Sequence, residues 1–408
     1  MSETVLDPRE KVRCLITLIG ALAVVATSSS LTWPILAESL RNAGWSETMI
    51  GLNAASQFAG IVVVALAATW IMPRLGFFRT VLIGLVTVAA TLVLLPALRD
   101  YWVWLVVRFA LGAGNALLFT AGDTWIIQIL DDRVRGRWLG LYSTVGMAGW
   151  AVGPILGATM DPEGWWPFLC GLLAVLAATA LLMGTRSIDI RLVADKPAPP
   201  GGYLLAVFLA APTVLLSSAM FGVVEGGVQS FAHLYSMDLL GADQRPVGYA
   251  VIWVASVGAV FFQYPVGWLA DRVDRGWLLV ACVAILTGMI ALFPFLIGAG
   301  TRPWWSPPAL ALWGAIAIWG GAMGATYTVG ITLVGERFRA VELVAANAVF
   351  SLLFGIGGLA GPFLVGAAMS HFGPQGFPGM LVAAVASYTL FAAYRQATRR
   401  GRATTARH

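Results

Sequence analysis

Charged residues are scarce in this 408-residue chain, and their scarcity excludes most classes of soluble protein. Asp, Glu, Lys and Arg together make up 11% of the residues, whereas soluble domains carry about 25%. Hydrophobic residues make up 59% of the chain, above the roughly 45–50% of an ordinary globular domain. This composition predicts an integral membrane protein.

Residues that carry enzyme or metal chemistry are also few. The three histidines, His233, His371 and His408, have no spacing typical of a metal site, and three cysteines give no disulfide framework. No G-x-x-x-x-G-K-[ST] sequence occurs, which argues against ATP drive. No nucleophile and base stand out as a pair. The sequence therefore predicts no metal, no cofactor and no enzymatic activity.

The chain contains instead a series of long apolar stretches. A stretch of about 20 apolar residues is enough to span the hydrocarbon core of a bilayer. Twelve stretches meet this criterion and predict helices near 13–36, 46–71, 77–98, 102–127, 136–159, 165–185, 203–235, 246–270, 277–298, 307–334, 341–369 and 377–394. The predicted fold class is an all-α integral membrane protein with 12 transmembrane helices.

Basic residues lie almost entirely on one side of these helices. Of the 25 Lys and Arg residues, 20 fall in the chain ends and the even-numbered gaps, and four in the odd-numbered gaps. Because basic segments resist translocation, we expect a multi-pass protein with both termini in the cytoplasm. The basic residues are spread over short segments, so their expected partner is the lipid bilayer and not a nucleic acid. The excess of Arg over Lys favours a bacterial source, hence the inner membrane.

The longest of these gaps divides the chain into two halves. It predicts a six-helix bundle over 1–185, a cytoplasmic linker over 186–202, a second six-helix bundle over 203–395 and a cytoplasmic tail over 396–408. The halves are pseudo-symmetric: Pro73-Arg74-Leu75-Gly76 corresponds to Asp271-Arg272-Val273-Asp274, and Gly149, Gly153 and Pro154 correspond to Gly357, Gly361 and Pro362. Repeated halves of this kind are typical of secondary transporters, which bind substrate between the halves near mid-membrane.

The end of the eighth predicted helix carries a recognisable motif, Gly267-Trp268-Leu269-Ala270-Asp271-Arg272-Val273-Asp274-Arg275. It resembles the G-x-L-A-D-R-x-G-R-R loop of the major facilitator superfamily, with Asp274 in the place of the glycine. A carboxylate at a helix end can face an arginine or the N-terminus of a neighbouring helix, so the resemblance implies a gating latch weighted on Asp271. The first-half copy keeps only Arg74, Gly76 and Arg79. Alternatively, these charges are solvated and only set topology.

A glycine motif, Gly149-x-x-x-Gly153-Pro154-x-x-Gly157, lies in the fifth predicted helix. Small residues at this spacing let two helices approach closely, and proline bends a helix. The string resembles the helix-5 motif of antiporter branches of the superfamily and so favours export. Close packing with no bearing on direction is the alternative.

Three charged residues inside predicted helices are candidates for the transport site. A charge within the membrane is costly and usually faces a cavity or a partner. Glu225 precedes Gly226-Gly227, which predicts a helix break, and can bind a proton in alternation with substrate. Arg108 can bind an anionic group or tune a proton-carrying acid, and Asp123, about 22 Å along the same helix, can be a gating charge. Alternatively, Glu225 is a hydrogen-bonded structural acid, and Arg108 snorkels to the outer interface or bonds to backbone. The alternative for Asp123 is a solvated helix end.

Further strings resemble one branch of the superfamily, the bacterial YcaD-like permeases. They are Glu225-Gly226-x-x-x-Ser230-Phe231-x-x-x-Tyr235, and Asp123-Thr124-Trp125 before Arg135-Gly136-Arg137, where the branch usually has Glu in the place of Asp123. The resemblance covers nearly the whole chain.

The resemblance implies a secondary transporter of a small molecule that works by alternating access. The position of Glu225 in an apolar helix adds the expectation of proton coupling, and we expect the protein to function as a monomer. Export of a hydrophobic or amphipathic compound is slightly favoured over proton-coupled uptake of a small organic acid. A transporter-like sensor or assembly protein that carries nothing is the remaining hypothesis.

Overall fold

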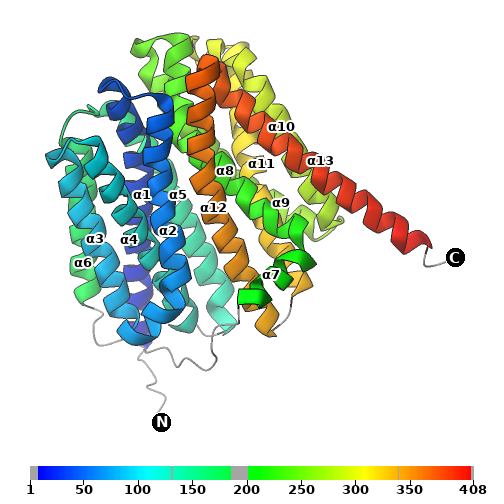
Figure 1. Cartoon of the computed structure of the whole chain (residues 1–408). Helices are drawn as coiled ribbons and strands as arrows, with labels where there is room; N and C mark the ends of the chain where they lie inside the picture. Colours follow the sequence, from blue (N-terminus) through cyan, green and yellow to red (C-terminus); the bar gives the residue numbers. More distant parts are fainter. Residues whose placement is uncertain (1–7, 130–131, 185–200, 339, 406–408) are drawn as a thin grey trace. The chain divides into compact units, whose positions relative to one another are not determined.

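The computed structural model describes residues 8–129, 132–184, 201–338 and 340–405. Within these ranges all regular secondary structure is helical: α1 (Pro8–Asn42), α2 (Glu47–Leu75), α3 (Phe77–Ala97), α4 (Tyr101–Ile129), α5 (Asp132–Thr159), α6 (Trp166–Met183), α7 (Gly201–Ala210), α8 (Pro212–Leu240), α9 (Arg245–Ala270), α10 (Arg275–Leu296), α11 (Pro307–Arg337), α12 (Ala340–Phe372) and α13 (Gly376–Thr405) (Figure 1). Short 3-10 turns η2 (Ala242–Gln244), η3 (Ile297–Thr301) and η4 (Gly373–Gln375) lie between helices.

The prediction of an all-α membrane protein is confirmed. Ten segments of the described residues are long and apolar enough to cross a membrane. The helices follow the predicted apolar stretches because the bilayer core offers no hydrogen-bond partners. Each backbone N–H and C=O must therefore be paired within its own helix.

The seventh predicted helix, 203–235, is wrong in detail because it consists of two helices. Ala211 separates them, with φ −142° and ψ 52°, and Pro212 begins α8. Proline lacks the N–H that would continue α7 and disfavours a helical conformation in the residue before it. The chain therefore breaks at this proline, near the start of the predicted stretch.

The predicted helix break at Gly226-Gly227 is also wrong. Helix α8 runs without interruption from Pro212 to Leu240. A Cβ atom added at Gly226 would lie 2.9 Å from Cδ of Pro362 on α12. The absence of a side chain at this position serves close packing of α8 against α12 rather than a break in α8.

The last helix continues beyond 394, where the sequence predicts its end. Helix α13 extends to Thr405, so most of the segment expected to be a tail is helical. The predicted linker lies almost entirely outside the described residues, and Gly201 and Gly202 begin α7.

The chain forms two compact units. The first consists of Met1–Ser39 and Ser56–Ala198, and the second of Leu40–Ala55 and Pro199–His408. The end of α1 and the start of α2 therefore group with the second half of the chain.

In the first unit, α4 is held against α1, α2 and α3. The backbone of α4 meets that of α2 at Gly112, where an added Cβ would lie 2.7 Å from the carbonyl carbon of Gln57. Helix α5 meets α1 at Gly153 in the same way, with an added Cβ 2.5 Å from the backbone nitrogen of Leu31. A side chain larger than hydrogen at either position would push the helices apart.

In the second unit, α8 packs along α12, and α9 packs along α11. An added Cβ would lie 2.7 Å from the carbonyl carbon of Ala219 at Gly357, and 2.8 Å from Cα of Val223 at Gly361. Both glycines are on α12 and face α8, whereas Pro362 is buried in the same contact. This contact fixes how α8 is rotated about its own axis, and with it the direction in which the Glu225 face of α8 lies.

Candidate functional site

Glu225 lies in the middle of α8 and is partly buried. Nε2 of Gln229, one turn later, donates a hydrogen bond to Oε1 of Glu225 at 3.1 Å. Gln229 is itself buried, with 3% of its surface exposed. An amide can bond a carboxylate through its N–H and a carboxylic acid through its oxygen, so this pair can accommodate either protonation state.

Arg108 is fully enclosed in the first unit, with 1% of its surface exposed. Its Nε and Nη2 donate to Oε1 of Gln57 on α2 at 3.3 and 3.1 Å. Gln57 can approach because Gly112, one turn along α4, leaves room for the backbone of α2. The alternative in which Arg108 snorkels to the membrane surface is therefore wrong.

A second polar contact lies farther along α4. Nδ2 of Asn115 donates to Oγ of Ser29 on α1 at 2.9 Å, and both residues are buried. Arg108 and Asn115 are two turns apart on α4, so this helix carries polar groups toward both α2 and α1.

Asp123 is bound to a neighbouring helix and is not a free helix end. The hydroxyl of Tyr142 on α5 donates a hydrogen bond to Oδ1 of Asp123. This contact supports an interface role for Asp123 between α4 and α5. Asp123 and Arg108 have different partners, as their separation along α4 requires. Glu225 belongs to the second unit and both of these residues to the first.

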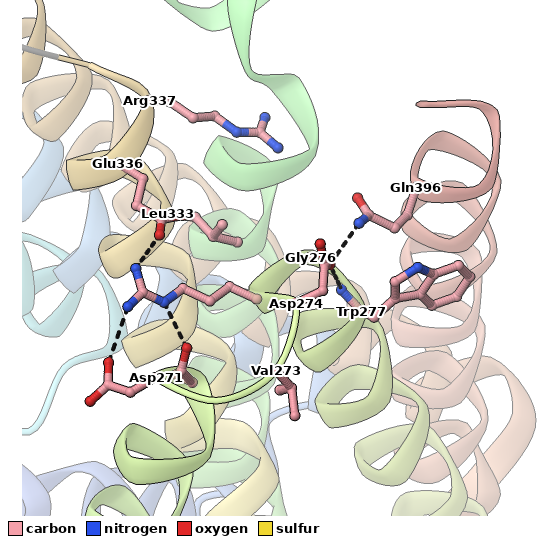
Figure 2. Close-up of a pocket in the computed structure, with 11 residues that line it drawn as sticks. Asp271, Val273, Asp274, Gly276, Trp277, Leu333, Glu336, Arg337 and Gln396 are labelled. Carbon is pink, nitrogen blue, oxygen red and sulfur yellow. Dashed lines mark hydrogen bonds and ion pairs between the residues drawn. The ribbon is translucent and has the colours of Figure 1, made fainter. Parts of the chain in front are cut away.

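The motif loop between α9 and α10 forms an ion cluster within the second unit (Figure 2). Arg275 donates to Oδ1 of Asp271 at 3.1 Å, to Glu336 at the end of α11, and to the carbonyl oxygen of Ala270 at 2.8 Å. The partner of Asp271 in the structure is thus an arginine of its own loop. The carboxylate of Asp271 stays largely in solvent, with 75% of its side chain exposed.

Asp274, which departs from the superfamily motif, caps α10. Its Oδ1 accepts from the backbone N–H of Trp277 at 2.8 Å and from Nε2 of Gln396 on α13 at 2.8 Å. Aspartate is among the strongest N-cap residues, so the substitution for glycine has a structural reason. These groups line a cavity of about 740 Å³ between α10, α11 and α13 (Figure 2).

The remaining motif residues lie nearby or in the first-half copy. The guanidinium of Arg272 stacks over the ring of Trp268 at 3.5 Å, and Gly267 has open space around it. In the first-half copy, Gly76 precedes α3 with φ 77°, a conformation that favours glycine. Arg74 and Arg79 are exposed.

Several polar residues were missed from the sequence, chiefly the amides Gln57 and Gln229 and the histidine His233. Another is Arg41, at the end of α1, which donates to Asp238 and, at 3.2 Å, to the carbonyl oxygen of Leu234 on α8. The available signal was the same for all of them: a polar residue inside or beside an apolar stretch.

A metal site is not evident in the described residues, where no group of three or more His, Cys, Asp or Glu side chains is placed to hold an ion. The arrangement consists of the partly buried acids Glu225 and Asp123, the enclosed Arg108 and several amides, distributed over both units. Such groups suit binding and proton exchange within a membrane.

Comparisons with known proteins identify the family. The model of the Major Facilitator Superfamily matches residues 18–319 and 254–407. The chain is 23% identical over 358 residues to the uncharacterized MFS-type transporter YfkF of Bacillus subtilis (strain 168), covering 87% of this chain and 88% of that protein. It is 26% identical over 329 residues to the uncharacterized MFS-type transporter YcaD of Escherichia coli (strain SE11), covering 80% of this chain and 81% of the relative.

Solved structures share the fold. A bacterial homolog of the human lysosomal transporter Spinster, in an inward-facing and unoccupied conformation, aligns with a TM-score of 0.69 at 16% identity, covering 95% of this chain and 96% of that one. The nucleoside transporter NupG aligns with a TM-score of 0.73 at 13% identity, covering 95% of this chain and 98% of that one. The fold and family expected from the sequence motifs are therefore confirmed, and the protein is a transporter and not an enzyme. The chain belongs to the Major Facilitator Superfamily of secondary transporters and is a distant homologue of YcaD and YfkF.

Proposed function

We propose that this transporter couples movement of its solute to protons, with Glu225 as the group that binds them. The observation that carries the proposal is the hydrogen bond between Glu225 and Gln229, in the middle of a long apolar helix. A carboxyl group there is costly as an anion and can take up a proton. Solute binding that alternates with protonation then links the two movements by mass action.

The solute we favour is a hydrophobic or amphipathic compound moved outward. The glycines of α5, Gly149, Gly153 and Gly157, with Pro154, resemble the antiporter motif, and Gly153 lies against the backbone of α1. Gly149 also faces α1, where an added Cβ would lie 2.5 Å from the carbonyl oxygen of Ala23. A close α1–α5 contact of this kind can keep the first unit rigid while it moves.

Arg108 favours a second candidate, proton-coupled uptake of a small organic acid. Its guanidinium is enclosed and donates two hydrogen bonds to the neutral amide of Gln57. A guanidinium bound to a neutral amide retains a positive charge that an anionic solute can meet. The two candidates differ in the sign of the solute charge that triggers proton movement.

We further propose a monomer in the bacterial inner membrane with both termini in the cytoplasm. The support is the distribution of Lys and Arg among the loops. In this orientation, Arg41, Glu47 and Asp238 are on the outer side, and the Asp271–Arg275–Glu336 cluster is on the cytoplasmic side. In this proposal, the first six-helix bundle comprises 1–185 and the cytoplasmic linker 186–202. The second bundle comprises 203–395 and the cytoplasmic tail 396–408.

Proton flux in proteoliposomes tests the coupling. The purified protein is reconstituted with a pH-sensitive dye inside, and drugs, sugars, amino acids and organic acids are added one at a time. We expect at least one class to move protons, and Glu225→Gln to reduce that flux at least tenfold while solute exchange continues. The matched control is Glu342→Gln, which alters an exposed acid at the start of α12.

Wild-type flux in the Glu225→Gln variant would assign Glu225 a structural role. A response confined to organic acids would favour the uptake candidate, and a response confined to hydrophobic amines or neutral drugs would favour export.

A further inference from the structure

A row of polar side chains extends from Glu225 along one face of α8. Glu225, Gln229 and His233 follow at intervals of four residues, so they share a face and advance about 6 Å per step. Gln229 is 3% exposed and His233 is 0% exposed. Burying an imidazole in an apolar bundle is unfavourable unless it serves a structural or functional purpose.

The row continues from α8 to the start of α9. The rings of His233 and Tyr249 lie with their centroids 5.3 Å apart. Helix α9 comes this close because Gly248 has no side chain; a Cβ atom there would lie 2.8 Å from the carbonyl oxygen of His233.

Arg245 is the last member of the row. Its Nη2 donates to the hydroxyl of Tyr249 at 3.2 Å, and its guanidinium carbon lies 4.7 Å from the centroid of the same ring. Arg245 is partly exposed. The row therefore connects the middle of α8 with the surface of the second unit where α9 begins.

In the part of the chain that the structure describes, the titratable and charged groups along this row and beside it come from three helices. They are Glu225, Tyr235 and Asp238 on α8, Tyr249 and Arg245 on α9, and Arg41 on α1, which binds the carbonyl oxygen of the next residue, Leu234. Asp238 is paired with Arg41, so the acid that faces His233 along the row is Glu225.

We propose that His233 relays protons between Glu225 and the Arg245 end of α9. This inference rests on the proposed proton coupling at Glu225 and adds the route by which protons reach it. A neutral imidazole carries a proton on one nitrogen and accepts one on the other, and it does both near neutral pH. No other side chain in the row combines these properties.

The transfer conserves protons and charge. One nitrogen of His233 accepts a proton from a hydronium ion at the Arg245 end, which becomes water, and the other nitrogen gives its proton to the carboxylate of Glu225, which becomes the neutral acid. The imidazole ends neutral, with its proton on the other nitrogen, and exchange with water restores the first tautomer. The Cα atoms of His233 and Glu225 are about 12 Å apart along α8, so the second step runs through bridging water. Oε1 of Gln229 has no hydrogen-bond partner in the part of the chain that the structure describes and can hold that water.

Infrared spectroscopy after a rapid drop in pH tests the relay without any solute. For the full-length protein in lipid nanodiscs, the absorbance of the C=O stretching band of protonated carboxyl groups is recorded over time. The part of this absorbance that is lost in Glu225→Gln belongs to Glu225. We expect His233→Gln to slow the appearance of this part about tenfold or more, since a positioned proton donor typically accelerates transfer by about 10² or more. His371→Gln, which alters an exposed histidine on α12, serves as the control and leaves the rate unchanged.

Tyr249→Phe provides a milder variant, because it keeps the ring against His233 and removes the hydroxyl that binds Arg245. We expect it to slow the same signal at least twofold without changing its final amplitude. A purely structural histidine would alter folding or amplitude but leave the rate of a well-folded variant unchanged.

The outcomes separate the relay from the proposed function. If Glu225→Gln removes no part of the band, Glu225 does not bind protons and the proposed function fails. If the Glu225 signal exists but appears in His233→Gln at a rate within twofold of wild type, only the relay fails. If His233→Gln does not fold, nitrogen NMR of the wild-type histidines decides: a His233 signal that does not titrate between about pH 5 and 8 overturns the relay.

Discussion

Arg41, in the last turn of α1, donates a hydrogen bond to Asp238 near the end of α8. The same guanidinium donates to the carbonyl oxygen of Leu234 at 3.2 Å and lies 4.0 Å from Glu47 at the start of α2. One arginine thus ties the junction of α1 and α2 to α8. Beside it, Thr48 bonds Oγ of Ser370 on α12 through both its backbone N–H and its hydroxyl, each at 2.9 Å.

We predict that Arg41→Gln makes this junction separate more often from α8 and α12. Exposed ion pairs are worth about 0.2–1 kcal/mol, so the ratio of closed to open states should fall by up to about fivefold. The measurement is the rate of disulfide formation between Thr48→Cys and Ser370→Cys, after Cys14, Cys170 and Cys282 are replaced by alanine.

The control for this prediction is Arg302→Gln, which alters an exposed arginine between η3 and α11. Exchanging the two charges, with Arg41→Asp and Asp238→Arg, should restore the cross-linking rate. An unchanged rate in Arg41→Gln would mean that the ion pair contributes nothing to holding the junction closed.

Asp271 and Arg275 should differ in what they stabilise. Arg275 joins α10 to the end of α11 through Glu336, whereas Asp271 is mostly in solvent. We therefore expect Asp271→Asn to leave the melting temperature within about 2 °C of wild type and Arg275→Gln to lower it by more. Thermal unfolding monitored by size-exclusion chromatography measures both.

If Asp271 also takes part in a latch, Asp271→Asn should change the labelling rate of a cysteine placed at Glu342, at the start of α12, at least twofold. Equal labelling in wild type and Asp271→Asn would leave this acid with no role beyond its loop.

The extent to which the fold could be predicted follows from the length of the apolar stretches. A stretch of about 20 apolar residues has one stable form in a bilayer, and so most of the helices lie within a few residues of the predicted stretches. The apolar stretch does not predict the break at Ala211, because hydropathy does not register that Pro212 lacks a backbone N–H. The break expected at Gly226 was wrong because the sequence does not reveal that Pro362 packs against it.

Of the residues in the candidate site, only the charged ones could be predicted from the sequence. Glu225 and Arg108 are conspicuous because ionisable residues are rare in apolar helices. Their partners Gln229 and Gln57 are not, since an amide in a helix has many uses. The contact between Arg108 and Gln57 joins residues 51 positions apart, and it depends on the register of α2 against α4. His233 has no metal-site spacing that would mark it in the sequence, and its contact with Tyr249 depends on Gly248 in another helix.

Gly357 tests the close contact of α8 and α12. An alanine there would bring its Cβ within 2.7 Å of the carbonyl carbon of Ala219, so α12 must move. We expect Gly357→Ala to destabilise the folded protein by about 1–3 kcal/mol, seen as a lower melting temperature and a lower yield of monodisperse protein.

Gly314→Ala on α11 is the matched control for this substitution. An added Cβ at Gly314 has nothing within 4 Å, and alanine favours the helix by about 1 kcal/mol. The control should be neutral or slightly stabilising. Equal stability of the two variants would mean that α12 shifts without cost and that the glycine spacing is not needed for packing.

The orientation in the membrane can be tested at the two ends of α9. Ala242 precedes this helix and Val273 follows it, and both are exposed. Val273 lies between Arg272 and Arg275, where basic residues predict the cytoplasmic side. In a cysteine-free background, we expect a membrane-impermeant maleimide to label Ala242→Cys on intact cells, and Val273→Cys only after permeabilisation. The reverse pattern would place both termini outside the cell. It would also direct the His233 row toward the cytoplasm, so that protons would reach Glu225 from inside the cell and the direction of coupling would have to be inverted.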